Sequence, residues 1–370
     1  MNKKKHIVFF NGFYLPHLGG VERYTSNLVN KLKKYYNITI VTTGKSSEKS
    51  FEIIDGINIY RLPCYKTFSE RYPIIKHNRN FKDTLKKIQD MHIDHIICNT
   101  RYYQTTQIGV KIAKKNKIDL SIIDHSSSHI SLSNKFIDFF ARTYEDHLTR
   151  KILKSNPRFY GVSKRVNEWL EFYGIKASGV FYNSIDECKF NKRKLGKQIK
   201  IAYVGRVIKE KGVENLTKAY YRLKDKYDIT LTIAGDGNYL EFLKKNYPDV
   251  SYLGAINHND VVKLMQDTDI FVHPSMYPEG LPTVILEAGM MKCAVLATDR
   301  GGTKEVITSD KEGIIIKENS KDLENKLSKL LDDTKIIVNL QKGIYDKVCR
   351  DFTWENTAKG VWEELKKYEE

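Results

Sequence analysis

Two glutamates in one short segment, Glu279 and Glu287, could bind the hydroxyl groups of a sugar or a ribose. Glu279 lies in a loop rich in Pro and Gly, and Glu287 lies about one turn into the helix that Pro282 is expected to begin. A carboxylate can accept two hydrogen bonds from a vicinal diol. Either glutamate alone could be an ordinary surface residue, but the whole segment favours a ligand site.

The start of that helix is suited to bind an anion. The first N–H groups of a helix have no partner within it, and they lie at the positive end of the helix dipole. We therefore expect a phosphate or a sugar to lie against the residues that lead into the helix, which are Gly280, Leu281, Pro282, Thr283 and Val284.

A basic segment, residues 205–212, follows a predicted strand and could bind a diphosphate. Gly205 permits a sharp turn at the carboxyl end of the strand, which is the edge where open α/β sheets bind ligands. Arg206 could donate to two oxygens of the diphosphate, and Lys211 would add a second positive charge. Taken alone, the segment could equally be a solvated basic turn.

Two adjacent glycines, Gly19 and Gly20, lie between the first predicted strand and the first predicted helix. They permit the backbone to approach a ligand closely at a helix N-terminus. The pair is not the dinucleotide-binding fingerprint, which has a third Gly three residues after the second. Gly235 and Gly237 fail the same test, because Leu240 occupies that position.

The elements that must position these residues form a repeated pattern. Short apolar, β-branched runs alternate with longer amphipathic stretches, which is typical of βαβ units and parallel sheets. The strand-like runs are residues 6–11, 38–42, 58–62, 95–98, 120–123 and 159–163, then 199–205, 230–234, 250–253, 270–273, 294–298 and 313–316.

The series occurs twice, so the 370 residues predict an α/β protein with two doubly wound, Rossmann-like domains. We expect an N-terminal domain at residues 1–190 and a C-terminal domain at residues 191–351. A helix at about residues 352–370, with Trp354 and Trp362 as large apolar anchors, is expected to pack back on the first domain.

The composition argues against several classes of protein. Hydrophobic residues make up 41% and charged residues 29%, as in ordinary globular proteins. The apolar stretch at residues 7–10 is too short for a signal peptide, and no run of about 18 apolar residues predicts a membrane-spanning helix. The five cysteines are scattered, which favours thiols in a reducing cytoplasm over a disulfide framework or a zinc site.

The net charge of +17 is concentrated in the first half of the chain. Residues 1–190 hold 32 Lys and Arg against 17 Asp and Glu, whereas the remainder holds 30 against 28. Cations and aromatic residues interleave in one stretch: Arg61, Tyr65, Lys66, Phe68, Arg71, Tyr72, Lys76, Arg79, Phe81, Lys82, Lys86 and Lys87. We expect a surface patch that contacts an anionic membrane, where each Lys or Arg contributes about 1 kcal/mol; a solvated basic face is the alternative.

Together these segments resemble glycosyltransferase family 4, whose members have the GT-B fold of two Rossmann-like domains facing a central cleft. The resemblance covers nearly the whole chain, although Ser184 stands where the family usually has Gly in its Asn-Gly-(Val/Ile)-Asp linker. The matching residues, in chain order, are Gly19 and Gly20, 183–186, Arg206 and Lys211, 234–237, 273–275, Glu279 and Glu287, and Gly301, Gly302 and Glu305.

The resemblance implies a retaining transferase that moves a sugar from a nucleoside-diphosphate sugar to an acceptor. Arg206 and Lys211 would bind the diphosphate and stabilise it as a leaving group. Glu287 would hold the ribose and Glu279 the donor sugar. A UDP-linked donor is expected only as the commonest one, because backbone contacts to the sugar do not reveal its identity.

The resemblance also assigns roles in the first half of the chain. Gly19 and Gly20 would approach the phosphates from the N-terminal domain. His125 would lie near the reactive face of the donor, and His129 is a second candidate, on the acceptor side. Residues 252–256 would frame the base.

The type of enzyme that the chain resembles acts in bacterial surface-polysaccharide synthesis. We therefore expect a glycan acceptor linked to a lipid, and a protein located in the cytoplasm at the inner face of the cell membrane. No cofactor, no metal and no nucleic-acid partner are expected. Asp267 and Asp269 spell the Asp-x-Asp of metal-dependent transferases, but Asp269 precedes a buried-looking strand and is expected to cap it.

Two other classes of function remain possible from the sequence. A nucleic-acid-binding protein would explain the basic charge with 16 Phe and 23 Tyr, but not the two spaced carboxylates. A nucleotide-sugar epimerase or a phosphorylase would turn over the donor or phosphate without a separate acceptor.

Overall fold

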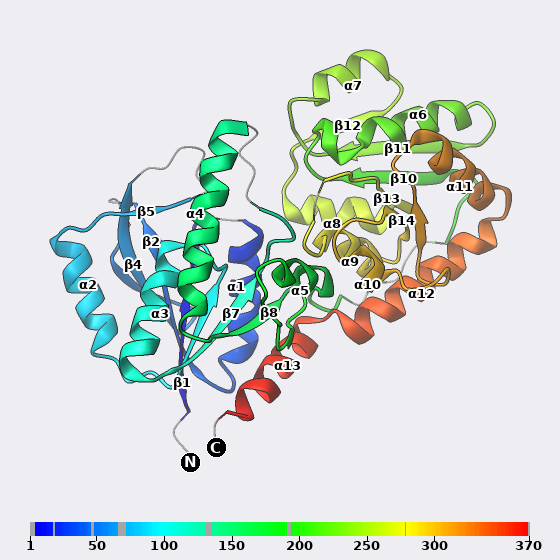
Figure 1. Ribbon diagram of the computed structural model, residues 1–370. Coiled ribbons are helices and arrows are strands. Elements are labelled where there is room, and N and C mark those ends of the chain that lie inside the picture. Colours follow the sequence, from blue (N-terminus) through cyan, green and yellow to red (C-terminus); the bar gives the residue numbers. More distant parts are fainter. Residues whose placement is uncertain are drawn as a thin grey trace. The chain divides into compact units, whose positions relative to one another are not determined.

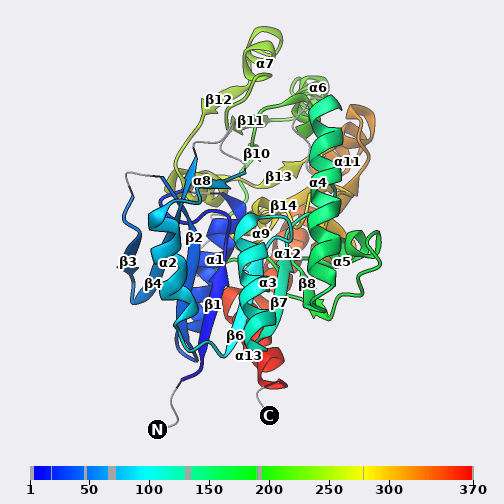
Figure 2. The same cartoon turned by 60° about the vertical axis from the view of Figure 1, so that its left-hand side comes forward.

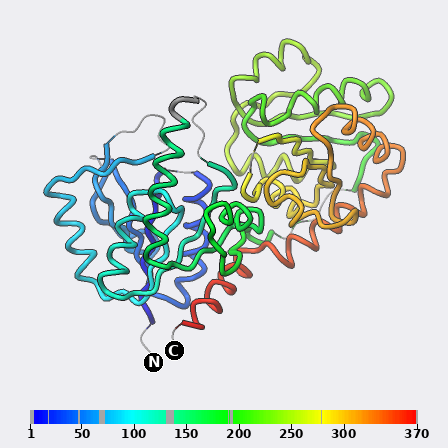
Figure 3. Tube along the Cα trace, in the orientation of Figure 1, coloured from blue at the N-terminus to red at the C-terminus, as the bar shows by residue number. Residues whose placement is uncertain are grey.

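The computed structural model describes residues 4–17, 19–45, 48–65, 72–129, 135–188, 190, 194–277 and 279–368. The chain forms two compact units (Figure 1). Unit 1 comprises Met1–Tyr182 and Trp354–Glu370, and unit 2 comprises Asn183–Thr353. The trace therefore leaves unit 1 once and returns to it for the last helix (Figure 3).

Unit 2 begins earlier than the expected boundary at 190/191, because the segment after Tyr182 makes its contacts within unit 2. The backbone N–H of Ile185 donates to the carbonyl of Phe352 at 3.0 Å. The N–H of Cys188 donates to the sulfur of Met290 at 3.4 Å.

Unit 1 is built on one sheet with the strand order β3-β4-β2-β1-β6-β7-β8-β9, in which β5 also pairs with β4. Along the order β4-β2-β1-β6-β7-β8-β9, neighbouring strands are parallel. Strands β3 and β5 are antiparallel to β4. The strands are β1 His6–Phe10, β2 Asn37–Gly44, β3 Phe51–Ile54, β4 Ile57–Tyr65, β5 Ile74–Ile75, β6 His95–Asn99, β7 Asp119–Asp124, β8 Arg158–Gly161 and β9 Gly179–Val180.

Alternation along β1 divides the core of unit 1 between the two faces of the sheet. Ile7 and Phe9 pack in one apolar cluster, and Val8 and Phe10 pack in the other. The first cluster includes residues of α1 and α13, and the second includes residues of α2 and α3, which lie on the near side of the sheet in Figure 2. The helices are α1 Gly20–Leu32, α2 Arg79–Gln89, α3 Gln104–Asn116, α4 Lys135–Leu153, α5 Lys164–Glu171 and α13 Trp354–Lys366.

The expected C-terminal helix is α13, and it belongs to unit 1. Trp354 is only 2% exposed and packs edge-on against Tyr24 of α1, with 5.2 Å between ring centroids. Trp362 stacks on Tyr35 at 4.7 Å. Both tryptophans therefore anchor the helix, as the sequence predicted.

Unit 2 contains a parallel sheet with the strand order β12-β11-β10-β13-β14-β15. This is the doubly wound order 3-2-1-4-5-6, so the direction of winding reverses between β10 and β13. The strands are β10 Ile199–Val204, β11 Ile229–Ala234, β12 Ser251–Gly254, β13 Ile270–His273, β14 Ala294–Thr298 and β15 Ile314–Ile316. The helices are η2 Lys209–Lys211 (a 3-10 turn), α6 Val213–Leu223, α7 Leu240–Asn246, α8 His258–Asp267, α9 Thr283–Met290, α10 Thr303–Val306, α11 Ser320–Asp332 and α12 Thr334–Asp351.

Within the described ranges, none of the helices is both long and apolar enough to cross a membrane.

Candidate functional site

The strongest candidate site lies where the winding of unit 2 reverses. The crevice outside the carboxyl ends of the strands at such a switch point is where open α/β sheets bind ligands. β10 ends at Val204 and β13 ends at His273, and these two strands are paired neighbours. The loops that follow them carry the basic segment and the first of the two spaced glutamates.

A close contact between these two loops positions Lys211. Gly212 ends the short turn Lys209–Lys211 with a left-handed backbone, φ 65°. A Cβ at Gly212 would lie 2.1 Å from the carbonyl oxygen of Pro274, so only glycine fits there. The N–H of Met276 also donates to the carbonyl of Glu210 at 2.8 Å, which joins the loops a second time.

Lys211 and Glu279 form an ion pair at the junction of the two loops. Both side chains are largely buried, with 11% and 17% of their surfaces exposed. The same Glu279 oxygen, Oε1, accepts a hydrogen bond from Ser275 Oγ at 3.0 Å. Burial alone would raise the pKa of Glu279, but the paired Lys211 ammonium opposes it, and the pKa is held at about 2. Glu279 is therefore an ionised carboxylate at neutral pH.

Arg206 and Lys211 lie beside the same aromatic ring. The Arg206 guanidinium carbon is 5.7 Å from the ring centroid of Tyr277, and Lys211 Nζ is 5.4 Å from it. Arg206 is exposed, and among the described residues no carboxylate forms an ion pair with it. The loops thus place two cations beside one ring, and the side chain of Arg206 is exposed to solvent.

The loop from Glu279 into α9 is supported by the turn after β14. Gly301 has φ 57°, and a Cβ there would lie 2.4 Å from the carbonyl oxygen of Glu279. The N–H of Gly302 donates to the carbonyl of Gly280 at 2.7 Å. The close approach explains why Gly301 is a glycine, whereas any residue except proline could make the backbone bond of Gly302.

The helix after Glu279 begins one residue later than expected. Helix α9 begins at Thr283, and Pro282 is its N-cap, with φ −69° and ψ 105°. The extended ψ of Pro282 keeps it outside the helix. Leu281 is buried and Val284 is half-buried, and Glu287 is half-buried on α9.

The structure therefore brings together Gly205, Arg206, Lys211 and Glu279, and places the residues from Gly280 to Glu287 directly after them in the chain. Residues 252–256 follow at the same edge of the sheet, where the N–H of Gly235 donates to the carbonyl of Gly254 at 2.7 Å.

The candidate residues of unit 1 lie at the carboxyl ends of its central strands. Gly19 is the N-cap of α1 and Gly20 is the first helical residue. His125 follows β7 and packs edge-on against Tyr24 of α1, with 4.7 Å between ring centroids. His125 is thus held beside the helix that the glycine pair begins.

A buried amide network fixes the protonation state of His125. Asn99 Nδ2 donates to Asn11 Oδ1 at 3.0 Å and to Thr25 Oγ1 at 3.1 Å, which leaves Asn99 Oδ1 as an acceptor. His125 Nε2 lies 3.0 Å from that oxygen and must donate to it. Burial lowers the pKa of His125 to about 4, so the ring is neutral and its Nδ1 is the acceptor.

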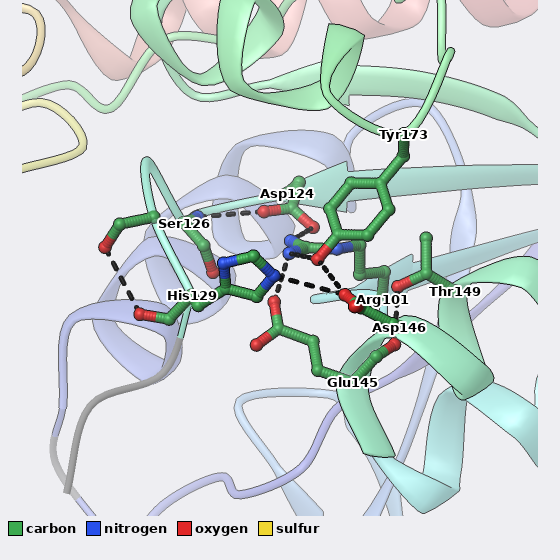
Figure 4. Close-up of polar contacts among 9 residues, drawn as sticks. Arg101, Asp124, Ser126, His129, Glu145, Asp146, Thr149 and Tyr173 are labelled. Atoms are coloured by element: carbon green, nitrogen blue, oxygen red, sulfur yellow. Dashed lines mark hydrogen bonds and ion pairs between the residues drawn. The ribbon is translucent and has the colours of Figure 1, made fainter. Parts of the chain in front are cut away.

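His129 belongs to a second polar cluster of unit 1, drawn in Figure 4. Arg101 is fully buried and forms ion pairs with Asp124, at 2.8 Å, and with Glu145. At the edge of this cluster Asp146 Oδ1 accepts from Tyr173 Oη at 2.9 Å and lies 3.1 Å from His129 Nε2 (Figure 4). Asp124 also accepts from the N–H of Ser126 at 2.9 Å, so the cluster holds the start of the loop that carries His125.

The prediction of a basic surface patch at residues 61–87 is wrong for two residues, Arg61 and Phe81, which are buried. Arg61 is 3% exposed, because it pairs with Glu48 at 3.3 Å and with Glu52. Phe81 is 7% exposed on the inner face of α2. The exposed bases are those on the outer face of α2, Arg79, Lys82, Lys86 and Lys87, while Lys66, Phe68 and Arg71 lie outside the described residues.

Asp269 caps a strand, but that strand is the neighbouring β10 and not β13, which it precedes. Its Oδ2 accepts from the backbone N–H of Lys200 at 2.9 Å, and Asp267 pairs with the Lys200 ammonium at 2.6 Å. Across the described part of the chain, no three His, Cys, Asp or Glu side chains are grouped so that they could hold a metal ion. Metal independence remains a prediction.

Sequence reasoning did not assign roles to Tyr277, Asn99 or His273. The first shares its ring with both cations, the second fixes the tautomer of His125, and the third lies 3.8 Å from Glu279. Only His273 had a signal in the sequence, because it begins the His-Pro-Ser motif at the end of β13.

Comparison with known proteins identifies the family of the chain. Residues 18–188 match the family model described as Glycosyltransferase Family 4, and residues 184–346 match the model described as Glycosyl transferases group 1. An uncharacterized glycosyltransferase of Methanocaldococcus jannaschii is 29% identical over 96% of this chain and 95% of its own length.

A relative that matches part of the chain and a solved structure with a similar fold are also found. The N,N'-diacetylbacillosaminyl-diphospho-undecaprenol alpha-1,3-N-acetylgalactosaminyltransferase of Campylobacter jejuni is 40% identical over 38% of each chain. Anabaena HepE, solved in complex with UDP, has a TM-score of 0.74 at 16% identity and covers 98% of this chain and 100% of its own, which shows a common fold. With both halves matched in order by the two models, the chain belongs to the family 4 glycosyltransferases of the GT-B fold.

Proposed function

We propose that this glycosyltransferase moves a sugar, with retention of anomeric configuration, from a nucleoside-diphosphate sugar to a lipid-linked glycan acceptor. The observation that carries the proposal is the meeting of Arg206, Lys211 and Glu279 at the switch point of unit 2. An anionic leaving group needs fixed positive charge where its own charge develops, and preorganised charge of this kind supplies much of the rate enhancement of many enzymes.

The proposed reaction breaks the bond between the anomeric carbon and the diphosphate oxygen. Arg206 and Lys211 stabilise the negative charge that remains on the diphosphate, and the first amides of α9 add to it. The acceptor hydroxyl attacks the anomeric carbon from the same face, and its proton passes to a diphosphate oxygen. Glu279 is already ionised and paired with Lys211, so we assign it to sugar hydroxyls and not to nucleophilic attack.

The remaining site residues keep the roles that the family resemblance implies. Glu287 binds the ribose, and Gly280 to Val284 contact the sugar and phosphates. Gly19 and Gly20 act on the phosphates, and His125 acts on the sugar through its Nδ1 lone pair. All of these are predictions, as is the absence of a metal.

Calorimetry with UDP-, GDP- and ADP-sugars tests the donor site directly. We expect one of the three to bind the wild type, and Glu287→Ala and Lys211→Met to weaken that binding at least tenfold. Lys218→Met on α6 is the matched control, because Lys218 is 43% exposed and pairs with Glu214 one turn away on the same helix. If wild type binds none of these donors, or if Lys211→Met binds like the control, the site assignment is wrong.

A lipid-linked acceptor is supported by the undecaprenol-dependent relative from Campylobacter jejuni. UDP as the donor nucleotide is supported by the HepE complex. Proton NMR of the product made from an α-linked donor decides the stereochemistry, because retention predicts an α-glycoside. A β-linked product would contradict the retaining mechanism while leaving the donor site intact.

We also propose that unit 1 contacts the inner face of an anionic membrane. Phe139 and Phe140 on α4 are 66% and 70% exposed, and such rings favour the headgroup level of a bilayer. The exposed lysines of α2 and the basic excess of residues 1–190 add attraction for anionic lipid. Replacing Phe139 and Phe140 by Ser should reduce sedimentation with phosphatidylglycerol vesicles, whereas Phe242→Ser on α7 of unit 2 should not.

A further inference from the structure

The imidazole of His273 lies at the centre of unit 2 without a hydrogen bond. His273 ends β13 and is 3% exposed. Among the described residues, neither of its ring nitrogens has a hydrogen-bond partner. A neutral imidazole carries one N–H and one lone pair, so this side chain holds an unused donor in a buried place, which is rare in folded proteins.

The nearest charge to this ring is the carboxylate of Glu279. His273 Nε2 lies 3.8 Å from Glu279 Oε1, which is beyond hydrogen-bonding distance. That same oxygen already takes Lys211 and Ser275 as its donors. His273 is therefore the third polar group beside this oxygen, and it lies farther from it than the two that bond to it.

Two anions compete for Lys211 in the proposed reaction, the Glu279 carboxylate and the diphosphate of the donor. In the structure it is paired with Glu279, yet in the proposed function it binds the diphosphate of the donor. When Lys211 moves toward the diphosphate, Glu279 loses its main partner while remaining largely buried. The ionised carboxylate would then keep only the Ser275 hydroxyl as a donor, and a second donor would stabilise it in this buried place.

We propose that His273 is a positioning residue that donates from Nε2 to Glu279 when the donor's diphosphate draws Lys211 away. The exchange keeps the carboxylate ionised and in place to accept from sugar hydroxyls. A shift of under about 1 Å brings the two atoms within hydrogen-bonding distance. Burial keeps His273 neutral by lowering its pKa, so the ring acts as a hydrogen-bond donor and not as an acid. This inference rests on the proposed function of the site.

The test measures binding of the free nucleoside diphosphate, using UDP, GDP and ADP, by calorimetry. His273→Leu removes the donor at similar volume, and His273→Gln restores a donor. We expect His273→Leu to weaken binding by roughly tenfold to a hundredfold, which is the worth of one hydrogen bond to a charged group, and His273→Gln to recover most of it. His95→Leu in unit 1 is the control for losing a buried imidazole, because His95 is 7% exposed and bonded to Ser121.

A double-mutant cycle separates this role from a structural one. In Glu279→Gln the side chain is neutral, so no carboxylate is present to accept a hydrogen bond from His273. Adding His273→Leu to this variant should therefore change diphosphate binding less than about twofold. An equal loss in both backgrounds would make His273 merely structural and overturn the inference. Wild-type binding to none of the three diphosphates would instead contradict the proposed function, and equal binding by wild type and His273→Leu would overturn the inference alone.

Discussion

The buried cluster around Arg101 offers a prediction with a magnitude that the structure sets. Arg101→Met keeps the length of the side chain but removes the cation that pairs with both Asp124 and Glu145. All three side chains are at most 1% exposed. Breaking a buried pair by removing one partner typically costs about 3–5 kcal/mol.

Protonation of the carboxyls limits that cost and makes it depend on pH. A carboxyl with an ordinary pKa near 4 can be neutralised at pH 7 for about 4 kcal/mol, and at pH 5 for only about 1 kcal/mol. In the variant, protonation would remove the buried negative charge, so the lost stability should be largest at pH 7 and shrink as the pH falls toward 4. We expect Arg101→Met to lower the free energy of unfolding by about 4 kcal/mol or more at pH 7, and by about 1–2 kcal/mol at pH 5.

Tryptophan fluorescence in a urea titration reports this change selectively. The chain has three tryptophans, Trp169, Trp354 and Trp362, and all of them belong to unit 1. Arg165→Met is the control, because Arg165 and Glu168 are each 59% exposed and such pairs contribute at most about 1 kcal/mol. A loss below about 1 kcal/mol at pH 7, or an equal loss at pH 5 and pH 7, would refute the view that Arg101 holds two ionised carboxylates.

Three further predictions follow from the two candidate sites. Gly212→Ala should weaken nucleotide binding at least tenfold and increase hydrogen exchange in the loop after β10, because its Cβ would lie 2.1 Å from the Pro274 oxygen at φ 65°. Nitrogen-15 NMR should find His125 as the Nε2–H tautomer with a pKa of about 4, and a titration near pH 6.5 would contradict its burial. The pKa of Glu279 is lowered to about 2, so its stabilisation is complete above pH 4.5 and is lost as the pH falls toward 2. The difference in unfolding free energy between wild type and Glu279→Gln should therefore shrink over that window.

Much of the fold could be predicted because its strands are buried on both faces. Runs such as residues 270–273 and 294–298 are almost entirely apolar and are buried throughout, which is typical of strands in parallel sheets, and each predicted run overlaps an observed strand. The strands that the pattern missed are short or lie at the edge of the sheet: β3, β5 and β9. At an edge one side of the strand has no neighbour, so the apolar signal is weak.

The candidate site was predictable where the backbone required a particular residue, as at Gly205, whose φ is 151°. It was not predictable where the outcome depended on a partner distant in sequence. Arg61 looked like a surface cation, yet the carboxylates of Glu48 and Glu52 bury it. The sequence also could not show that the His273 imidazole is buried without a hydrogen-bond partner, because this depends on how the side chains pack in the fold.

The return of the chain from unit 2 to unit 1 has a consequence for biosynthesis. The core of unit 1 includes Trp354, Ala358, Val361 and Leu365, which a ribosome makes only after the whole of unit 2. Unit 2 can fold from one continuous stretch as it emerges, whereas unit 1 must wait with an uncovered apolar face until the final helix is released. In a chain that ends before Trp354, unit 2 should therefore resist protease better than the incomplete unit 1.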